Sequence, residues 1–153
     1  MKHLLGIEQL TKEEITALTD DAVALKSNRG KDSSVKETLK GETWAMIFSK
    51  SSTRTRVSFE VGLSELGATS LFLNANDIQL GRGEPIKDTA RVLGRMVHGA
   101  IIRTFAQQDV VDFAEYGKIS TINALTDEEH PCQILADLLT MRELLGGWEG
   151  KKV

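Results

Sequence analysis

With 153 residues, the chain has the length of one compact domain that buries a core of its own. Hydrophobic residues make up 41% of it and charged residues 27%, which excludes a disordered chain, and no stretch is long and apolar enough for a membrane span. The 19 Lys and Arg against 22 Asp and Glu leave a formal charge of −3, so no overall positive field would recruit nucleic acid or an anionic membrane, and any anion site must be local. The single cysteine excludes an intramolecular disulfide and suits a reducing compartment, so we expect a cytoplasmic protein.

The first expected element is an amphipathic helix from Thr11 to about Lys26, because apolar residues recur there at three- and four-residue intervals. Thr11 with Glu14 forms a capping box that marks its start. After a polar stretch, Asn28 to Lys40, apolar runs alternate with helical patterns. The expected strands are Thr43–Phe48, Thr69–Leu73, Ala100–Ile102 and Ile119–Ala124. The expected helices are Thr53–Leu66, Ile86–Met96, Asp109–Tyr116 and Pro131–Leu145.

Strands that alternate with helices of these lengths predict βαβ units with right-handed crossovers. The fold class is therefore α/β, a three-layer domain with a central parallel sheet of about four strands flanked by helices. We assign residues 1–150 to this domain. The Gly-rich end of the chain and the apolar Val153 resemble a linker running into another strand, so we expect residues 151–153 to begin a further domain.

Hydroxyls, cations and amides converge where the strand Thr43–Phe48 leads into the next helix. A helix start presents unpaired N–H groups and the positive end of the helix dipole. Ser52, Thr53 and Thr55 add hydroxyl donors there, and the guanidinium of Arg54 matches phosphate or carboxylate oxygens two at a time. This cluster predicts an anion site.

The other predicted strands end in similar residues. The loop Asn74 to Glu84 contains Gln79 and Arg82, Arg103 and Thr104 follow the third strand, and His130 to Gln133 follow the fourth. In an open α/β sheet, ligands bind beyond the carboxyl ends of the strands. These side chains therefore predict a phosphate site along one edge of the sheet.

Other readings stay open for individual residues. Arg56 and Glu60 are four apart, so an ion pair along the helix is about as plausible for Arg56 as a ligand role. Cys132 follows His130 closely, but adjacency at a helix start does not bring nucleophile and base together, and we expect a packed, inert thiol. The chain has no metal-ligand spacing and no nucleotide-binding glycine motif, so we expect no metal and no cofactor.

Three motifs together resemble the aspartate/ornithine carbamoyltransferase family. They are Ser-Thr-Arg-Thr-Arg at 52–56, Arg-Thr-Phe at 103–105 and His-Pro-Cys-Gln-Ile-Leu-Ala-Asp-Leu at 130–138. The loop from Asp77 to Glu84 and the segment from Lys87 to Leu93 are more similar to the ornithine branch, because the aspartate enzymes carry a lysine where Arg82 stands. The resemblance covers the carbamoyl-phosphate-binding half of such an enzyme, and the ornithine-binding domain would follow from residue 151.

The resemblance implies a role for each matched residue. Ser52, Thr53, Arg54 and Thr55 would hold the phosphate end of carbamoyl phosphate, while Arg103, His130 and Gln133 would hold its carbamoyl end. Thr55 would also reach the carbonyl oxygen, so that Arg54, Thr55, Arg103 and His130 form the catalytic set. Gln79 matches a residue that the family supplies from a neighbouring subunit, which implies a homotrimer.

The implied reaction transfers a carbamoyl group to the δ-amine of ornithine and gives citrulline, a step of arginine biosynthesis. An enzyme with another acceptor, such as aspartate or a diamine, is the nearest alternative. A different alternative is a binding or assembly fragment that is catalytically silent without the second domain. For that case we expect exposed apolar surface along the helix Pro131–Leu145.

Overall fold

The computed structural model describes residues 3–75 and 78–151, with the side chains of residues 81 and 82 excepted. Asn76, Asp77 and the last two residues, which belong to segments singled out in the sequence, lie outside this description. The strands are β1 (Thr43–Phe48), β2 (Thr69–Asn74), β3 (Gly99–Arg103) and β4 (Ser120–Leu125). The α-helices are α1 (Lys12–Asn28), α2 (Thr53–Glu65), α3 (Ile86–Leu93), α4 (Gln107–Gly117) and α5 (Pro131–Leu145), and short 3-10 helices are η1 (Ile7–Gln9), η2 (Ser33–Glu37) and η3 (Gln79–Arg82).

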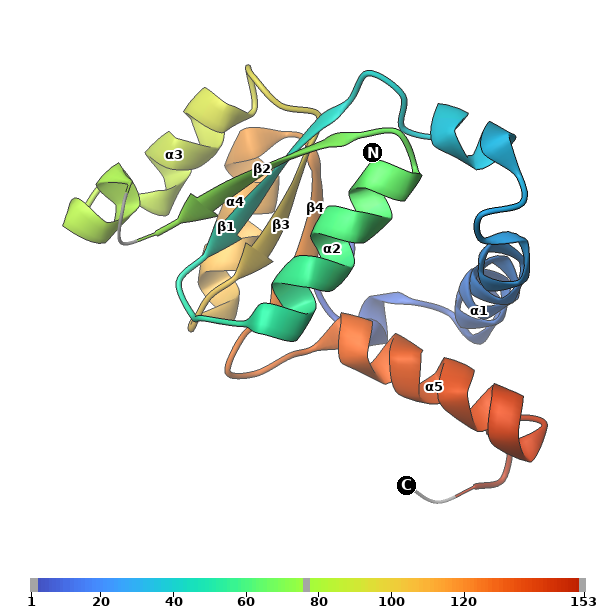
Figure 1. Ribbon diagram of the computed structural model, residues 1–153. Helices are drawn as coiled ribbons and strands as arrows, with labels where there is room; N and C mark the ends of the chain where they lie inside the picture. Colours follow the sequence, from blue (N-terminus) through green and yellow to red (C-terminus); the bar gives the residue numbers. More distant parts are fainter. Residues whose placement is uncertain (1–2, 76–77, 152–153) are drawn as a thin grey trace.

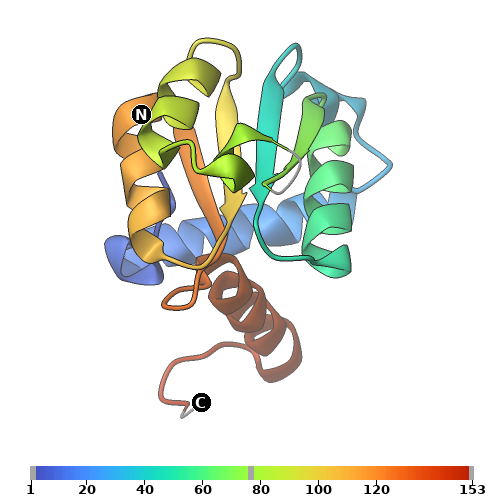
Figure 2. The same ribbon diagram turned by 90° about the vertical axis from the view of Figure 1, so that its left-hand side faces the viewer.

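The four strands form one parallel sheet in the order β2-β1-β3-β4. Helix α2 covers one face of it, and α3 and α4 cover the other, which gives the three layers seen edge-on in Figure 2. The predicted α/β class and parallel sheet are confirmed. Helices α1 and α5 contact each other, with α1 on the right-hand side of Figure 1 and α5 below it.

Alternating side chains of β1 supply both cores. Ala45 and Ile47 join the cluster under α3 and α4, while Trp44, Met46 and Phe48 join the cluster under α2. All five are at least 92% buried, as expected for a central strand of a parallel sheet, which has apolar residues on both faces.

The predicted bounds hold closely for most elements. The capping box at α1 is present, since the Thr11 amide donates to Glu14 Oε2 at 2.9 Å and the Glu14 amide donates to Thr11 Oγ1 at 3.2 Å. The predicted helix Ile86–Met96 was too long, because α3 ends at Leu93. Gly94 follows it, and a Cβ there would collide with the Gly117 carbonyl of α4, so close packing of the two helices requires this glycine.

The N-terminal segment was not predicted as part of the sheet. Leu4 forms a parallel bridge with Ile122, with its amide 2.9 Å from the Thr121 oxygen. The segment therefore lies along β4, at the edge that β3 leaves open. Within the part of the chain that is described, no helix is long and apolar enough to cross a bilayer.

Candidate functional site

The strand order reverses between β1 and β3, and we call the region beyond the carboxyl ends of these two strands the crevice. From β1 the chain passes through α2 to β2 on one side, and then through α3 to β3 on the other side of β1. This reversal is a topological switch point, where open α/β sheets bind ligands beyond the carboxyl ends of their strands. Phe48 and Arg103 are register partners at these ends, and the Ser49 amide donates to the Arg103 oxygen at 2.8 Å. The segments predicted to bind an anion flank this crevice.

The start of α2 forms one side of the crevice. Ser52 is the N-cap, and its hydroxyl oxygen accepts the Thr55 amide at 3.3 Å. The amides of Thr53 and Arg54 are among those that helix geometry leaves without an intrahelical acceptor. Arg54 is exposed. These donors and the helix dipole favour an anion at this point.

Arg103 at the end of β3 and His130 before α5 form the other side. Arg103 Nε and His130 Nδ1 are buried and have no hydrogen-bond partner among the described residues. Burial lowers the pKa of His130 below its ordinary value of 6.5, the nearby Arg103 charge lowers it further, and Asp137 opposes both effects. His130 is therefore neutral near pH 7, and a neutral imidazole offers one N–H donor. Buried polar atoms without partners are uncommon in folded proteins, and these two suit a polar ligand.

The first turn of α5 contains the remaining residues of the His-Pro-Cys-Gln motif. Pro131 occupies the first helical position, where its missing N–H costs nothing. Gln133 is exposed, and its Nε2 donates to Asp137 Oδ1 at 2.9 Å, so its amide is paired within the helix. The Cys132 thiol donates to the Asn123 oxygen at 3.3 Å, and burial raises its pKa to about 11. The prediction of an inert, packed thiol agrees with this environment.

Arg56 is turned away from the crevice. Its Nε lies 3.0 Å from Glu60 Oε1, and its guanidinium stacks 3.6 Å from the centre of the Phe72 ring on β2. The ion pair along the helix, one of the two readings of this residue, is therefore the one that the structure supports.

Gln79 lies apart from the other candidate residues. It begins η3, beyond the end of the edge strand β2, and its side chain is exposed. In Figures 1 and 2 this segment projects from the molecule beside α3, on the side away from α5. Arg82 lies in the same short helix, but its side chain is outside the description.

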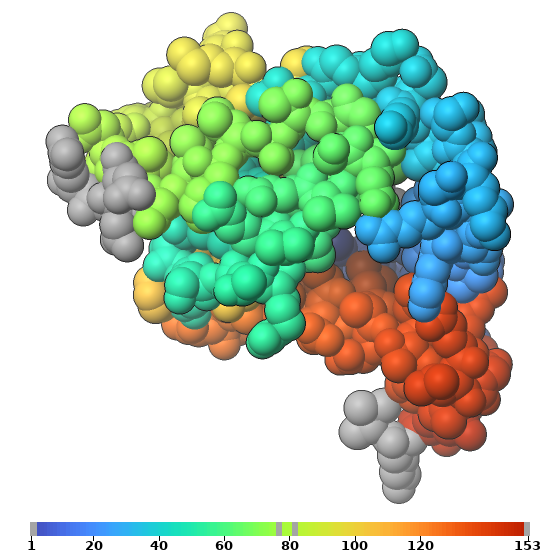
Figure 3. All heavy atoms as spheres, in the orientation of Figure 1, coloured from blue at the N-terminus to red at the C-terminus, as the bar shows by residue number. Residues whose placement is uncertain are grey.

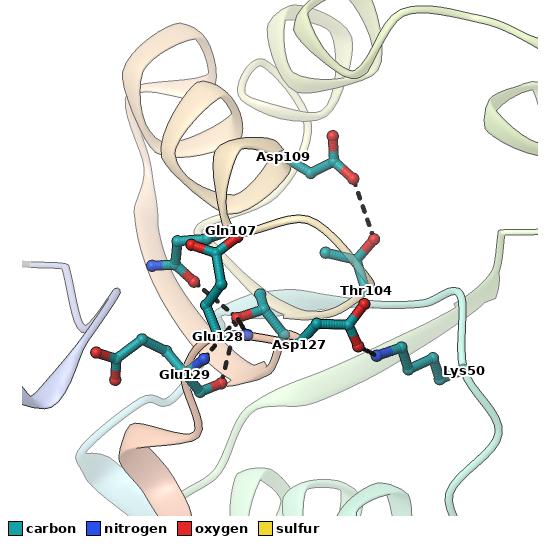
Figure 4. A network of polar contacts seen from close by, with 8 residues as sticks. Lys50, Thr104, Gln107, Asp109, Asp127, Glu128 and Glu129 are labelled. Atoms are coloured by element: carbon teal, nitrogen blue, oxygen red, sulfur yellow. Dashed lines mark hydrogen bonds and ion pairs between the residues drawn. The ribbon is translucent and has the colours of Figure 1, made fainter.

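Lys50 connects the loops that surround the crevice, and sequence reasoning missed it. Its ammonium pairs with Asp127 in the β4–α5 loop and lies 4.5 Å from the centre of the Phe105 ring in the β3–α4 loop. The Asp127 amide also donates to the Phe105 oxygen at 2.8 Å. Figure 4 shows Lys50 and Asp127 facing each other beside Thr104, which bonds to Asp109 at 3.2 Å. The only signal in the sequence is the position of Lys50 just before the Ser-Thr-Arg-Thr cluster.

A wide groove lies on the other side of α2. It has a volume of about 1190 Å³ and runs between α2 and the segment from the end of α1 to η2; Figure 3 shows a hollow between these parts. Thr53 and Arg54 line it, whereas Arg103 and His130 do not. Because the polar groups without partners lie elsewhere, the crevice and not this groove is the candidate site. Within residues 3–75 and 78–151, no group of three His, Cys, Asp or Glu is arranged to hold a metal ion.

The chain matches a family model and many known proteins. Residues 2–143 match the model described as the aspartate/ornithine carbamoyltransferase, carbamoyl-P binding domain. The chain is 64% identical to the ornithine carbamoyltransferase of Akkermansia muciniphila and 55% identical to that of Carboxydothermus hydrogenoformans; the alignments cover 100% and 99% of this chain but 50% and 49% of those proteins.

Solved structures give the same result. The ornithine carbamoyltransferase of Burkholderia thailandensis superposes with a TM-score of 0.89 at 43% identity, covering 99% of this chain and 52% of that one. The anabolic ornithine carbamoyltransferase of Campylobacter jejuni gives 0.85 at 47% identity, covering 94% and 45%. The chain belongs to the aspartate/ornithine carbamoyltransferase family, and it spans about half the length of the relatives that it matches. The resemblance seen in the sequence motifs is thereby confirmed.

Proposed function

We propose that this chain binds carbamoyl phosphate in the crevice between β1 and β3 and forms half of an ornithine carbamoyltransferase. The observation that carries the proposal is the buried, unpartnered pair Arg103 Nε and His130 Nδ1, at the same carboxyl edge of the sheet as the start of α2. Cationic and neutral donors on one side and helix amides on the other suit a ligand with a carbonyl at one end and a phosphate at the other.

Each candidate residue then has a role. Ser52, Thr53 and Arg54 bind the phosphate, and Thr55 bridges to the carbonyl oxygen. Arg103 and His130 donate to that oxygen. Gln133 accepts the carbamoyl NH₂ through its Oε1, because the 2.9 Å bond to Asp137 uses only its Nε2.

These donors fit the charge that develops in the reaction. When an amine attacks the carbamoyl carbon, the new C–N bond forms and electrons move onto the carbonyl oxygen, which Arg103, His130 and Thr55 stabilise. When that oxygen reforms its double bond, the C–O bond to phosphate breaks. The leaving phosphate keeps the electron pair beside Arg54 and the helix start, and it takes up the proton that the attacking amine releases. No protein nucleophile is needed, because positioning and charge stabilisation supply the catalysis.

We propose that the acceptor amine is bound by a second domain that begins near residue 151. Two facts support this: the chain spans about half of its relatives, and α5 presents apolar side chains to solvent. Ile134, Leu144 and Leu145 are 37%, 77% and 58% exposed, as expected for a helix that a further domain covers. Ornithine is favoured over aspartate or a diamine because the relatives above are named ornithine carbamoyltransferase. By itself the chain then binds carbamoyl phosphate but forms no citrulline.

Calorimetric titration with carbamoyl phosphate tests the site. We expect Arg54→Ala to weaken binding on the order of tenfold to a hundredfold, since a charge-assisted bidentate contact contributes about 1.5–3 kcal/mol. Arg95→Ala is the matched control, because Arg95 is an exposed arginine in the turn that precedes β3, at the opposite edge of the sheet. Equal affinities in Arg54→Ala and the unmodified chain would rule out this phosphate site.

A further inference from the structure

We propose that Thr126 is a positioning residue for His130: its hydroxyl, oriented by Gln107, fixes the turn between β4 and α5 that holds the imidazole beside Arg103. The proposal about geometry stands alone, and its consequence for ligand binding rests on the proposed function. Neither Thr126 nor Gln107 is part of the motifs that identify the site.

The Thr126 hydroxyl is the centre of the turn. It accepts the Glu129 amide at 2.9 Å and the Glu128 amide at 3.4 Å, and the Thr126 amide donates to the Glu129 oxygen at 2.8 Å. The residue is only 4% exposed, so water does not replace these bonds easily. Both the hydroxyl and the backbone amide of Thr126 thus form hydrogen bonds that close the turn immediately before His130.

Gln107 orients that hydroxyl. Thr126 Oγ1 donates to Gln107 Oε1 at 2.8 Å, the shorter of its two acceptor distances, since the Glu129 oxygen lies at 3.3 Å; the hydroxyl lone pairs remain for the two amides. Gln107 Oε1 also accepts Asn123 Nδ2 at 3.0 Å, while Gln107 Nε2 donates to the Leu5 oxygen at 3.0 Å. Figure 4 shows Gln107 above Glu128 and Glu129. The turn is therefore fixed relative to α4, β4 and the N-terminal segment.

His130 needs such support because its own side chain is not held by a hydrogen bond. Its Nδ1 has no partner among the described residues, and it makes no side-chain cap bond at the start of α5. The imidazole therefore takes its position from its backbone and from packing. The charged groups that act on it are Arg103 from β3 and Asp137 from α5. A turn that loosened would move the imidazole toward water and away from Arg103.

The first test measures the imidazole itself. The titration of His130 is followed by NMR of the ligand-free chain with labelled histidine, with His130→Gln to assign the signal. We expect a pKa below 6.5 in the unmodified chain, a rise toward 6.5 in Thr126→Val, and no rise in Thr126→Ser, which keeps the hydroxyl. Contact with water and a greater distance from Arg103 both favour the protonated imidazole, so the pKa of His130 should rise in this variant.

Thr121→Val is the matched control. Thr121 is also a buried threonine, but it lies within β4 and its hydroxyl donates to the Ile119 oxygen at 3.0 Å, at the end of the strand away from the site. Thermal unfolding of both valine variants compares their stability. A general loss of stability would move His130 in both variants, whereas a positioning role moves it only in Thr126→Val. If Thr126→Val does not fold, Gln107→Met removes the same hydrogen-bond acceptor from a less buried position.

The second test is calorimetric titration with carbamoyl phosphate. We expect Thr126→Val to weaken binding roughly fivefold to thirtyfold and Thr126→Ser and Thr121→Val to bind as the unmodified chain does. An unchanged His130 pKa in Thr126→Val, or an equal change in Thr121→Val, would overturn the proposal. If the unmodified chain binds no carbamoyl phosphate, the proposed function is wrong, while the imidazole titration still decides the role of Thr126.

Discussion

Cys132 and His130 stand two residues apart, and burial keeps both uncharged near neutral pH. Burial lowers the pKa of the imidazole and raises the pKa of the thiol from its ordinary 9.0 to about 11. A neutral imidazole beside Arg103 acts as a hydrogen-bond donor and avoids a second positive charge. A protonated thiol is a poor nucleophile, so the residue that looks reactive in the sequence is a packing residue.

The first prediction concerns this thiol. At pH 8 we expect Cys132 in the folded chain to react with iodoacetamide on the order of a hundred times more slowly than in the urea-unfolded chain, because the higher pKa lowers the thiolate fraction by about that factor. Mass spectrometry of timed samples gives the two rates. Cys132→Ser should bind carbamoyl phosphate normally; a large loss of binding would mean that the thiol belongs to the site.

At the residue scale, the sequence predicted the polar residues at the ends of the strands. It did not predict the residues whose hydrogen bonds keep the surrounding loops in place. That Arg103 and His130 lie near each other could be predicted, because parallel strands bring their carboxyl ends to one edge. The pairs of Lys50 with Asp127 and of Thr126 with Gln107 could not be found, since their members lie 77 and 19 residues apart in the chain. No local pattern specifies such pairs.

At the element scale, the strands were the most predictable part of the fold. A central strand buried on both faces is a continuous apolar run, and β1 was predicted with its exact bounds. The predicted end of α3, Met96, lies three residues beyond the observed end, because the helical pattern of the sequence continues that far. The helix ends at Leu93, and the next residue is Gly94, which the close packing against α4 requires. The bridge from Leu4 to β4 was missed because a few residues carry no periodicity.

The second prediction concerns the end of α2. Gly67 has a φ of +92°, and a Cβ there would collide with the Lys36 carbonyl of η2. We expect Gly67→Ala to lower the free energy of unfolding by about 2–4 kcal/mol, from backbone strain and this overlap together. Urea denaturation measures it. Gly30→Ala is the control, because Gly30 has a φ of +74° with open space around it, so only the strain of about 1–2 kcal/mol applies. Equal losses would show that the contact with η2 adds nothing.

At the scale of the whole molecule, the order of the strands determines where the site lies. The alternation of strands and helices predicts a parallel sheet, but it does not say on which side of β1 the chain adds β3. Because β3 lies on the side opposite β2, the chain leaves β1 and β3 toward different sides of the sheet, and the start of α2 and Arg103 come to lie at this switch point. The position of the candidate site thus follows from the topology, and Gln79, beyond the edge strand β2, lies outside it.

That separation motivates the last prediction, which is that Gln79 completes the site of a neighbouring subunit. The connection from β2 to α3 is long for a βα loop, and such loops are usually functional. A head-to-tail contact closes without open ends in a cyclic oligomer, and we expect a trimer. Light scattering of the chain at micromolar concentration measures the assembly.

In the two-domain enzyme, Gln79→Ala and Arg54→Ala should each be inactive alone. Refolded together in equal amounts, they should regain up to about a quarter of full activity, because a site is intact when one subunit retains Arg54 and its neighbour retains Gln79. Arg54→Ala mixed with Arg103→Ala is the control, since both residues come from one chain and no intact site can form. A mixture of the first pair as inactive as this control would place Gln79 outside any shared site.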